Sequence, residues 1–288
     1  MRRAELATLS AKRPGQAGCA FYHAEMDLRQ SRDEQLQQEL QTALQQDSMT
    51  LMFQPVMNAH SELVSAEVLT RWYRTDGEFI PPAEFVALAE QGGMIAELDF
   101  WVANRVCQFI QTSHAQGWSL PTLTLNISAF SFGQADFVDA LIALVKEHGI
   151  APHQLGIELN EAALLMQPQF VAERVSKLVD AGIGIVLDHF GSGSSALSCL
   201  ANQPLVAVKL DMSCIDSLAA MPQRVKALIV SAQQFNLHVV AKGVESPQHY
   251  QAFVEFGCDG YQGYLFSRAL NQADFIQLVC PRPLLRSV

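Results

Sequence analysis

Short apolar runs alternate with longer stretches of helical periodicity along most of the chain. The runs are apolar almost throughout, as is typical of parallel strands that are covered on both faces. The strand-like runs lie at residues 51–56, 63–72, 123–128, 155–160, 183–190, 206–211, 238–244 and 260–266. The helical stretches lie near residues 83–91, 97–115, 134–148, 169–181, 223–236, 246–256 and 272–279. This order predicts an α/β fold and favours a closed (βα)8 barrel of the TIM type over an open doubly wound sheet, because no G-x-G-x-x-G motif opens a helix.

The first part of the chain has a different pattern. Residues 1–28 are rich in small and basic side chains and cannot form a core alone. In the next segment Leu36, Leu40 and Leu44 recur at a spacing of four, which predicts an amphipathic helix. We therefore expect an N-terminal extension at 1–28, a linker helix at 29–47 and a barrel domain at 48–282.

Composition narrows the class of protein. About half of the 288 residues are apolar and 17% are charged, which indicates a large buried core and argues against disorder. A net charge of −10 excludes a general binder of nucleic acid or of anionic membranes, although a small anionic ligand stays open. No apolar run reaches the roughly 18 residues of a membrane helix, and six scattered cysteines predict free thiols in a reducing compartment. We expect a cytoplasmic chain, whose longer parent protein could still carry a membrane anchor.

Polar residues lie inside the apolar runs or at their carboxyl ends, about once in each βα unit. They are Gln54, Glu67, Arg71, Asn126, Glu158, Asp188, Lys209, Lys242 and Gln262. In a barrel the carboxyl ends of the strands converge on one face, so these side chains would meet in one cup. Carboxylate and amide oxygens suit Mg²⁺ or Mn²⁺, and a lysine would add a positive charge for phosphate or an activated water. The set favours metal-assisted phosphodiester chemistry.

At these same residues the sequence resembles the EAL-domain family of cyclic di-GMP phosphodiesterases, over about residues 30–280. The motifs that carry the resemblance include AEVLTRW (66–72), LNIS (125–128), IELNE (157–161), LDHFGSGSSAL (187–197), VVAKGVE (239–245) and GCDGYQGYLFSR (257–268). The resemblance implies a barrel whose first strand runs antiparallel to the others, with the cyclic dinucleotide bound across the carboxyl ends of the strands. In active members two divalent metal ions activate a water that opens one phosphodiester bond to give pGpG.

The resemblance also implies a role for single residues. The positions that match ligands of the first metal are Glu67, Asn126, Glu158 and Asp188. The positions that match contacts to the dinucleotide are Gln54, Leu69, Arg71, Asp99 and Gln262. Three further matches are Lys209, at the lysine near the attacking water; Glu161, at the glutamate that supports the loop after the fifth strand; and Glu245, at the second glutamate of the E-G-V-E motif.

Two positions depart from the active pattern in charge. Active members have two adjacent aspartates where this chain has Asp188 and His189, and a glutamate where it has Lys242. Both lost carboxylates belong to the second metal site or its water. A Mg²⁺ ion beside an ammonium group is unfavourable by several kcal/mol, even at an effective dielectric constant of about 20. We expect Mg²⁺ or Mn²⁺ at one site, no second metal, and Lys242 in its place, paired with Asp188 or a ligand phosphate.

Three functions stay open at this point. The first is a domain that binds cyclic di-GMP with impaired hydrolysis, and the second is an active metal-dependent phosphodiesterase. The third is a protein-interaction module without a nucleotide, motivated by the altered loop at 191–197, which in the family often couples to the dimer interface. For this third function, two kinds of partner are possible: a second copy of the chain, bound through the barrel, and a different protein. Residues 3–27 also resemble the end of a GGDEF domain, which suggests a fragment or shortened relative of a tandem protein; an ordinary extension is the alternative.

Overall fold

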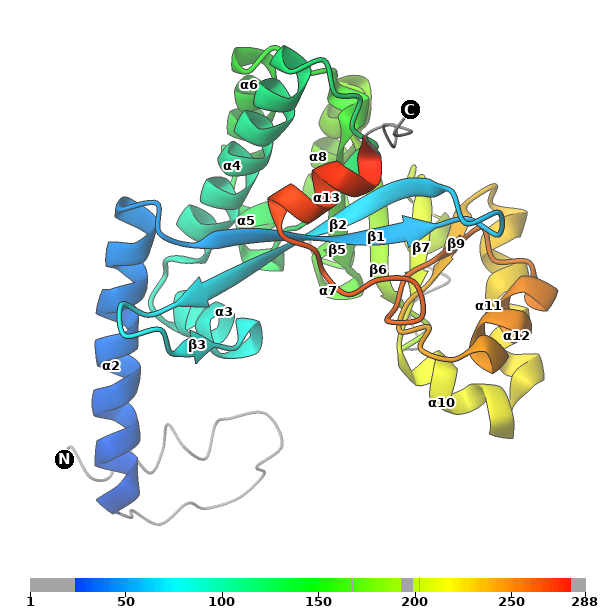
Figure 1. Cartoon of the computed structure of the whole chain (residues 1–288), viewed down its shortest axis with the longest axis horizontal. Coiled ribbons are helices and arrows are strands. Elements are labelled where there is room, and N and C mark those ends of the chain that lie inside the picture. The colour runs from blue at the N-terminus through cyan, green and yellow to red at the C-terminus, as the bar shows by residue number, and fades with distance from the viewer. Residues whose placement is uncertain (1–23, 167, 193–198, 202, 281–288) are drawn as a thin grey trace, which may run out of the picture. The chain divides into compact units, whose positions relative to one another are not determined.

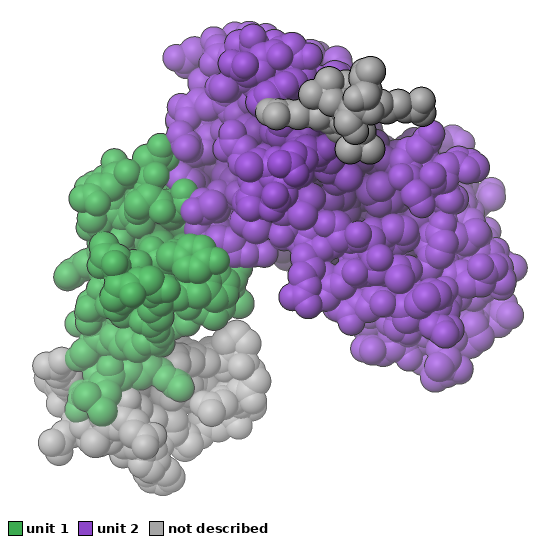
Figure 2. Space-filling model, in the orientation of Figure 1, with its two compact units in different colours: residues 1–49, 72–94 green, residues 50–71, 95–288 purple. Residues whose placement is uncertain are grey.

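The computed structural model describes residues 24–166, 168–192, 199–201 and 203–280 (Figure 1). The chain divides into two compact units, which Figure 2 colours separately. Unit 1 comprises residues 1–49 and 72–94, and unit 2 comprises residues 50–71 and 95–288. The segment that resembles the end of a GGDEF domain lies almost entirely outside the described residues.

Unit 2 contains a closed barrel, which confirms the predicted fold class. Its strands are β1 (Thr50–Met57), β2 (Leu63–Tyr73, whose last two residues belong to unit 1), β4 (Thr122–Asn126), β5 (Leu155–Asn160), β6 (Gly184–Phe190), β7 (Ala207–Leu210), β8 (His238–Ala241) and β9 (Gly260–Tyr261). They follow the order β1-β9-β8-β7-β6-β5-β4-β2, and pairing of β1 with β2 closes the ring. Strand β1 is antiparallel to both neighbours, whereas the remaining pairs in the ring are parallel. The antiparallel first strand was expected from the family resemblance and is present.

Helices cover the outside of the barrel strands. They are α4 (Ile95–Ala115), α5 (Ala129–Gly133), α6 (Phe137–Glu147), the 3-10 helix η1 (Pro152–Gln154), α7 (Glu161–Leu164), α8 (Pro168–Asp180), α10 (Ser213–Ala220), α11 (Pro222–Gln234), α12 (Pro247–Phe256) and α13 (Gln272–Val279). Each of the longer ones buries one apolar face; α6, for example, buries Val138, Leu141 and Val145. Helix α12 ends at Gly257, whose φ of 88° is the left-handed conformation that glycine adopts most readily.

Several predicted boundaries differ from those of the structure; for example, the strand expected at 238–244 ends as β8 at Ala241. The run at 260–266 was expected to be one strand, but β9 ends at Tyr261. Just beyond the strand, Gly263 lies against the backbone of Val244, where an added Cβ would come within 2.2 Å of the Val244 carbonyl oxygen, so this position requires glycine. The helix expected at 134–148 is present as α6, but it begins at Phe137, because Gln134 is extended and follows the end of the short helix α5.

Unit 1 is built around helix α2 (Ala24–Gln45), which confirms a helix in the predicted linker segment. Leu36, Leu40 and Leu44 are buried, as their spacing predicted. The other elements are β3 (Phe79–Ile80), which pairs with the last two residues of β2, and α3 (Pro82–Gln91), which packs against α2. Arg74 Nε and Nη2 donate to both carboxylate oxygens of Glu39 at 2.6 and 2.8 Å, which attaches α2 to the end of β2.

Two further expectations concern the whole chain. Among the described residues, no helix is long and apolar enough to cross a membrane. The cysteines in the described part of the chain, residues 107, 199, 214, 258 and 280, are free thiols, as expected from their scattered positions. Cys19 lies outside the described residues.

Candidate functional site

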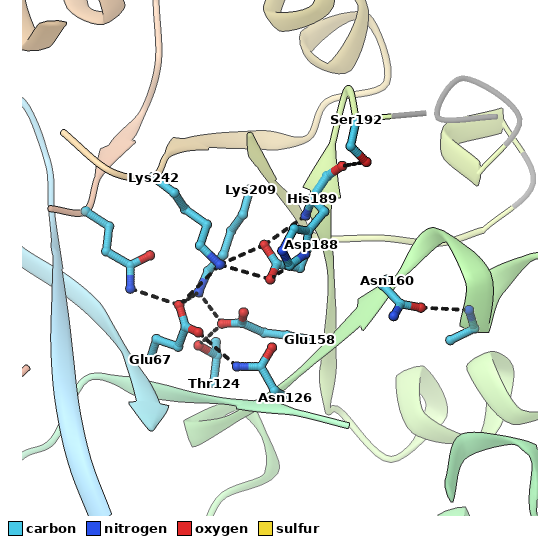
Figure 3. A network of polar contacts seen from close by, with 12 residues as sticks. Glu67, Thr124, Asn126, Glu158, Asn160, Asp188, His189, Ser192, Lys209 and Lys242 are labelled. Carbon is cyan, nitrogen blue, oxygen red and sulfur yellow. Dashed lines mark hydrogen bonds and ion pairs between the residues drawn. The ribbon is translucent and has the colours of Figure 1, made fainter. Parts of the chain in front are cut away.

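Polar side chains from neighbouring strands of unit 2 converge in one network (Figure 3). The register explains the convergence, because Gln54 lies opposite Glu67 on β1 and β2, and Asn126 lies opposite Glu158 on β4 and β5. Asp188 follows on β6 and Lys209 on β7. Lys242 and Gln262 come directly after β8 and β9. The structure therefore brings together most of the polar residues that the sequence placed in one cup, while Gln54 and Arg71 lie on β1 and β2 and, within the described part of the chain, make no side-chain hydrogen bond or ion pair with the other members.

Lys209 occupies the deepest part of this network. Its Nζ lies 2.8 Å from Glu67 Oε2 and also contacts Glu158 Oε1, and all three residues are almost fully buried. Glu67 also accepts hydrogen bonds from Asn126 Nδ2 at 2.8 Å and from Gln262 Nε2 at 2.9 Å. Burying ionised groups is costly unless they are paired and hydrogen-bonded, and here each carboxylate has a cation and a further donor.

The buried carboxyls differ in how easily they ionise. Burial raises the pKa of Glu67, but Lys209 and Lys242 outweigh it and bring the pKa to about 2. Burial together with repulsion from Glu67 raises the pKa of Glu158 to about 7. Burial lowers the pKa of Lys209, but the carboxylates of Glu158 and Glu67 raise it above the usual lysine value. Lys209 is therefore charged at neutral pH, and Glu158 is the carboxyl whose ionisation this environment opposes most.

Asp188 and Lys242 form a second ion pair, nearer the solvent. Lys242 Nζ lies 3.0 Å from Asp188 Oδ1 and 2.9 Å from Oδ2, and 3.7 Å from Glu67 Oε2. Figure 3 shows the ammonium group directed into the network beside that of Lys209. The Lys242 side chain keeps 18% of its surface exposed, compared with 3% for Lys209. An ammonium group therefore faces Asp188 at the position where the resemblance implies a carboxylate.

His189 supplies two more contacts to Asp188. Its backbone N–H donates to Asp188 Oδ1 at 2.9 Å, and its ring Nδ1 lies 3.1 Å from Oδ2. The His189 backbone has a φ of 58°, a left-handed conformation that is uncommon for a residue other than glycine. Burial raises the pKa of Asp188, but the contacts with His189 and Lys242 lower it below the usual value. The Asp188 carboxylate, in turn, raises the pKa of His189.

Strands β1 and β2 carry three residues that the resemblance matched to the dinucleotide. Leu69 and Arg71 alternate with their neighbours on β2, so they share the face of Glu67. Gln54, Leu69 and Arg71 are all half-buried. Arg71 Nη1 donates to its neighbour's carbonyl oxygen, Thr70 O, at 3.0 Å, and no ion pair of Arg71 occurs in the part of the chain that the structure describes. Its guanidinium therefore carries a charge that no described carboxylate neutralises.

The remaining predicted positions lie around this network. Asp99 is buried on α4, where one carboxylate oxygen accepts the backbone N–H of Ser128 at 2.9 Å and so holds the loop after β4. Glu161 begins α7 and is half-buried; within the described chain its Oε1 has no hydrogen-bond partner, and burial raises its pKa. Glu245 is exposed. The loop at 191–197 lies outside the described residues from Gly193 onward, so the supporting role of Glu161 and the interaction role of that loop stay predictions.

Thr124 is a member of the network that was not predicted from the sequence. Its hydroxyl donates to Glu158 Oε1 from the neighbouring strand, and the residue is buried. A signal was present, because Thr124 lies two residues before Asn126 and therefore points to the same side of β4. Threonine is common in strands, so this signal carries little weight without the pairing of β4 with β5.

The resemblance implies two metal ions, and the residues of the network differ in how well they suit each of them. Three carboxylates and the Asn126 amide oxygen have suitable donor chemistry for one Mg²⁺ or Mn²⁺, and Glu158 Oε2 is a buried oxygen without a hydrogen-bond partner among the described residues. The described side chains nevertheless contain no group of three or more His, Cys, Asp or Glu residues arranged to hold a metal ion. Lys242 instead occupies both oxygens of Asp188. The donors thus fit one metal ion by their chemistry, and the residues do not fit a second.

The fold and the site together define a barrel protein with an antiparallel first strand and a cup of ionised side chains at its strand ends. Residues 37–269 match the model of the EAL domain, and the chain belongs to this family.

Relatives and solved structures agree with this assignment. The chain is 33% identical over 277 residues to the cyclic di-GMP phosphodiesterase NbdA of Pseudomonas aeruginosa, covering 95% of this chain and 35% of that protein. It is 29% identical over 287 residues to the signaling protein YkoW of Bacillus subtilis, covering 98% and 36%. The chain thus spans about a third of the length of these curated relatives.

Solved structures show the same architecture. The PaMucR phosphodiesterase in complex with c-di-GMP superposes with a TM-score of 0.78 at 28% identity, covering 84% of this chain and 99% of that chain. The EAL enzyme Bd1971, bound to cAMP and cyclic di-GMP, superposes with a TM-score of 0.80 at 23% identity, covering 87% and 70%, and supports the fold.

Proposed function

We propose that this chain is a cyclic di-GMP-binding domain of bacterial second-messenger signalling with impaired phosphodiesterase activity. The observation that carries the proposal is the ion pair of Lys242 with both oxygens of Asp188. In this arrangement Asp188 is paired with an ammonium group, and the position beside it, where the resemblance implies a second aspartate, is His189. The site then lacks carboxylates that would hold the second of the two metal ions, and the water that these ions activate in active members is not activated in the same way.

Two observations support retained binding of the nucleotide. Arg71 presents a guanidinium that no described carboxylate neutralises, and such a group suits a phosphate oxygen. The solved PaMucR chain, whose structure contains c-di-GMP, resembles this protein over 99% of the solved chain and 84% of this one.

Paired binding and hydrolysis measurements test the proposal. In calorimetric titration with Mg²⁺ at roughly tens of micromolar protein, we expect saturable binding of cyclic di-GMP. Arg71→Ala should weaken this binding at least about tenfold, because a charge-assisted hydrogen bond is lost. The matched control is Arg224→Ala, which removes an exposed arginine of α11 and should change nothing. Absence of binding by the wild-type chain would overturn the proposal.

Hydrolysis is measured by chromatography of cyclic di-GMP incubated with Mn²⁺. We expect pGpG at a rate at least about tenfold below that of an active EAL phosphodiesterase assayed in parallel. A comparable rate would favour the second candidate function, an active metal-dependent phosphodiesterase. That candidate is supported by the convergence of Glu67, Asn126, Glu158 and Lys209 and by the name of the relative NbdA.

A further inference from the structure

The two lysines of the site are held in different ways. Lys209 is buried between Glu67 and Glu158, and its ammonium group is committed to both carboxylates. Lys242 reaches the network from its solvent side, with 18% of its side chain exposed and one close carboxylate partner, Asp188. A ligand that enters from solvent therefore meets the ammonium group of Lys242 and not that of Lys209.

Asp188 does not depend on Lys242 alone. The backbone N–H of His189 donates to Oδ1 at 2.9 Å, and the His189 ring nitrogen lies 3.1 Å from Oδ2. Both oxygens thus keep a donor if Lys242 turns away. Because His189 belongs to the strand end that carries Asp188, these contacts do not require Lys242 to stay in place.

The balance of charges in the network affects how an anionic phosphate group can bind there. Within the network, the three carboxyl groups of Glu67, Glu158 and Asp188 face the two ammonium groups of Lys209 and Lys242, so no positive charge is left over there for a phosphate. The guanidinium of Arg71 lies outside these ion pairs, and a further phosphate contact needs a cation that the network releases or that comes from solvent. A divalent ion at Asp188 would have to displace Lys242 or lie beside it, and like charges at that distance repel.

We infer that Lys242 is a built-in cation for the ligand, taking the place of a second metal ion. In this exchange its ammonium group leaves Asp188 for a phosphate oxygen of the dinucleotide, and His189 keeps Asp188 hydrogen-bonded. The inference rests on the proposed function, since it takes cyclic di-GMP as the ligand. It adds that binding requires no divalent ion.

The test compares cyclic di-GMP affinity in EDTA with that in Mg²⁺ by calorimetry. The wild-type chain should bind equally, within about twofold, in both buffers. Lys242→Gln should bind about 10- to 100-fold more weakly in EDTA, because one charge-assisted contact to phosphate is lost. Lys242→Arg keeps the charge and should stay within about threefold of the wild type. Lys226→Gln, the same change at an exposed lysine of α11, is the matched control and should have no effect.

The outcomes separate the inference from the proposed function. If the wild-type chain binds in neither buffer, the proposed function fails and the inference fails with it. If the chain binds only with Mg²⁺, or if folded Lys242→Gln binds as well as wild type in EDTA, the inference fails and nucleotide binding stands. Thermal unfolding of each variant shows whether it is folded. Should Lys242→Gln not fold, Lys242→Arg decides, because loss of its binding in EDTA would overturn the inference.

Discussion

The inner and outer ends of the cup of charged side chains both pair carboxylates with cations, but they differ in how far the groups are buried. At the inner end, Lys209 neutralises Glu67 and Glu158 in almost complete isolation from water. At the outer end, Lys242 and His189 surround Asp188, and both keep part of their surface exposed. Glu67, Glu158 and Lys209 keep the charged residues of active EAL members that the resemblance implies, and the two changes of charge, at His189 and Lys242, lie at the outer end.

This difference indicates which part of the site the barrel itself needs. An inner carboxylate without its lysine would be buried without a counter-ion, which is costly whatever the protein binds. At the outer end water and neighbouring donors replace a lost contact at lower cost. The outer residues are therefore free to change the chemistry of the site while the barrel persists.

The largest expected effect is a loss of stability when the buried lysine of the inner end is replaced. Lys209→Met should lower the free energy of unfolding by about 3–5 kcal/mol, because two buried carboxyls lose their cation. Lys242→Met should lower it by about 1–2 kcal/mol, since His189 still donates to Asp188. Urea-induced unfolding of the two variants beside the wild type measures both values.

A second variant shows whether lost pairing causes the larger effect. Glu158→Gln in the Lys209→Met background removes a buried charge that has become unpaired, and it should restore part of the lost stability. Equal losses for Lys209→Met and Lys242→Met would contradict the division into a structural inner end and a replaceable outer end.

The next largest expected effect is on the rate of hydrolysis, in a variant whose outer end has the carboxylates of active members. The double variant His189→Asp with Lys242→Glu restores both carboxylates, and we expect pGpG production in Mn²⁺ to rise at least about tenfold. The reason is that two carboxylates replace an ammonium group and an imidazole beside Asp188. Chromatography of the products measures the rate, and calorimetry measures the number of Mn²⁺ ions bound.

Lys242→Met alone is the control for this prediction, since it removes the ammonium group without supplying a ligand. It should give no comparable rise. If the folded double variant binds cyclic di-GMP yet gives no more pGpG than the wild type, the loss of turnover does not arise from these two residues.

Much of this site follows from local pattern in the sequence. Glu158 and Asp188 each interrupt an apolar run, and parallel pairing then brings them to neighbouring strand ends. The boundary of β9 could not be found in this way. The apolar run continues past Tyr261, where β9 ends, so periodicity alone does not show the end of the strand or the close approach of Gly263 to the backbone of Val244.

Side-chain partners were harder to predict than positions. The sequence left open whether Lys242 would pair with Asp188 or wait for a phosphate, and the structure places it on Asp188. His189 contacts Asp188 from a left-handed backbone conformation, and neither His189 nor its sequence neighbours predict this conformation. Thr124 was missed because its partner, Glu158, lies on another strand.

Thr124 gives the smallest and most local test of the inner end. Thr124→Val removes one hydrogen bond to Glu158 and should cost about 1 kcal/mol in urea-induced unfolding, because the carboxyl loses a buried donor. Valine keeps the methyl group that lies in the space left by Gly156, so packing changes little. Thr122→Val is the matched control on the same strand, where the hydroxyl donates at 3.1 Å to the carbonyl of His153 near solvent, and it should cost less than about 0.5 kcal/mol. A cost at Thr124 no greater than at Thr122 would mean that Lys209 alone stabilises Glu158, and that the hydroxyl contributes nothing to the buried charge.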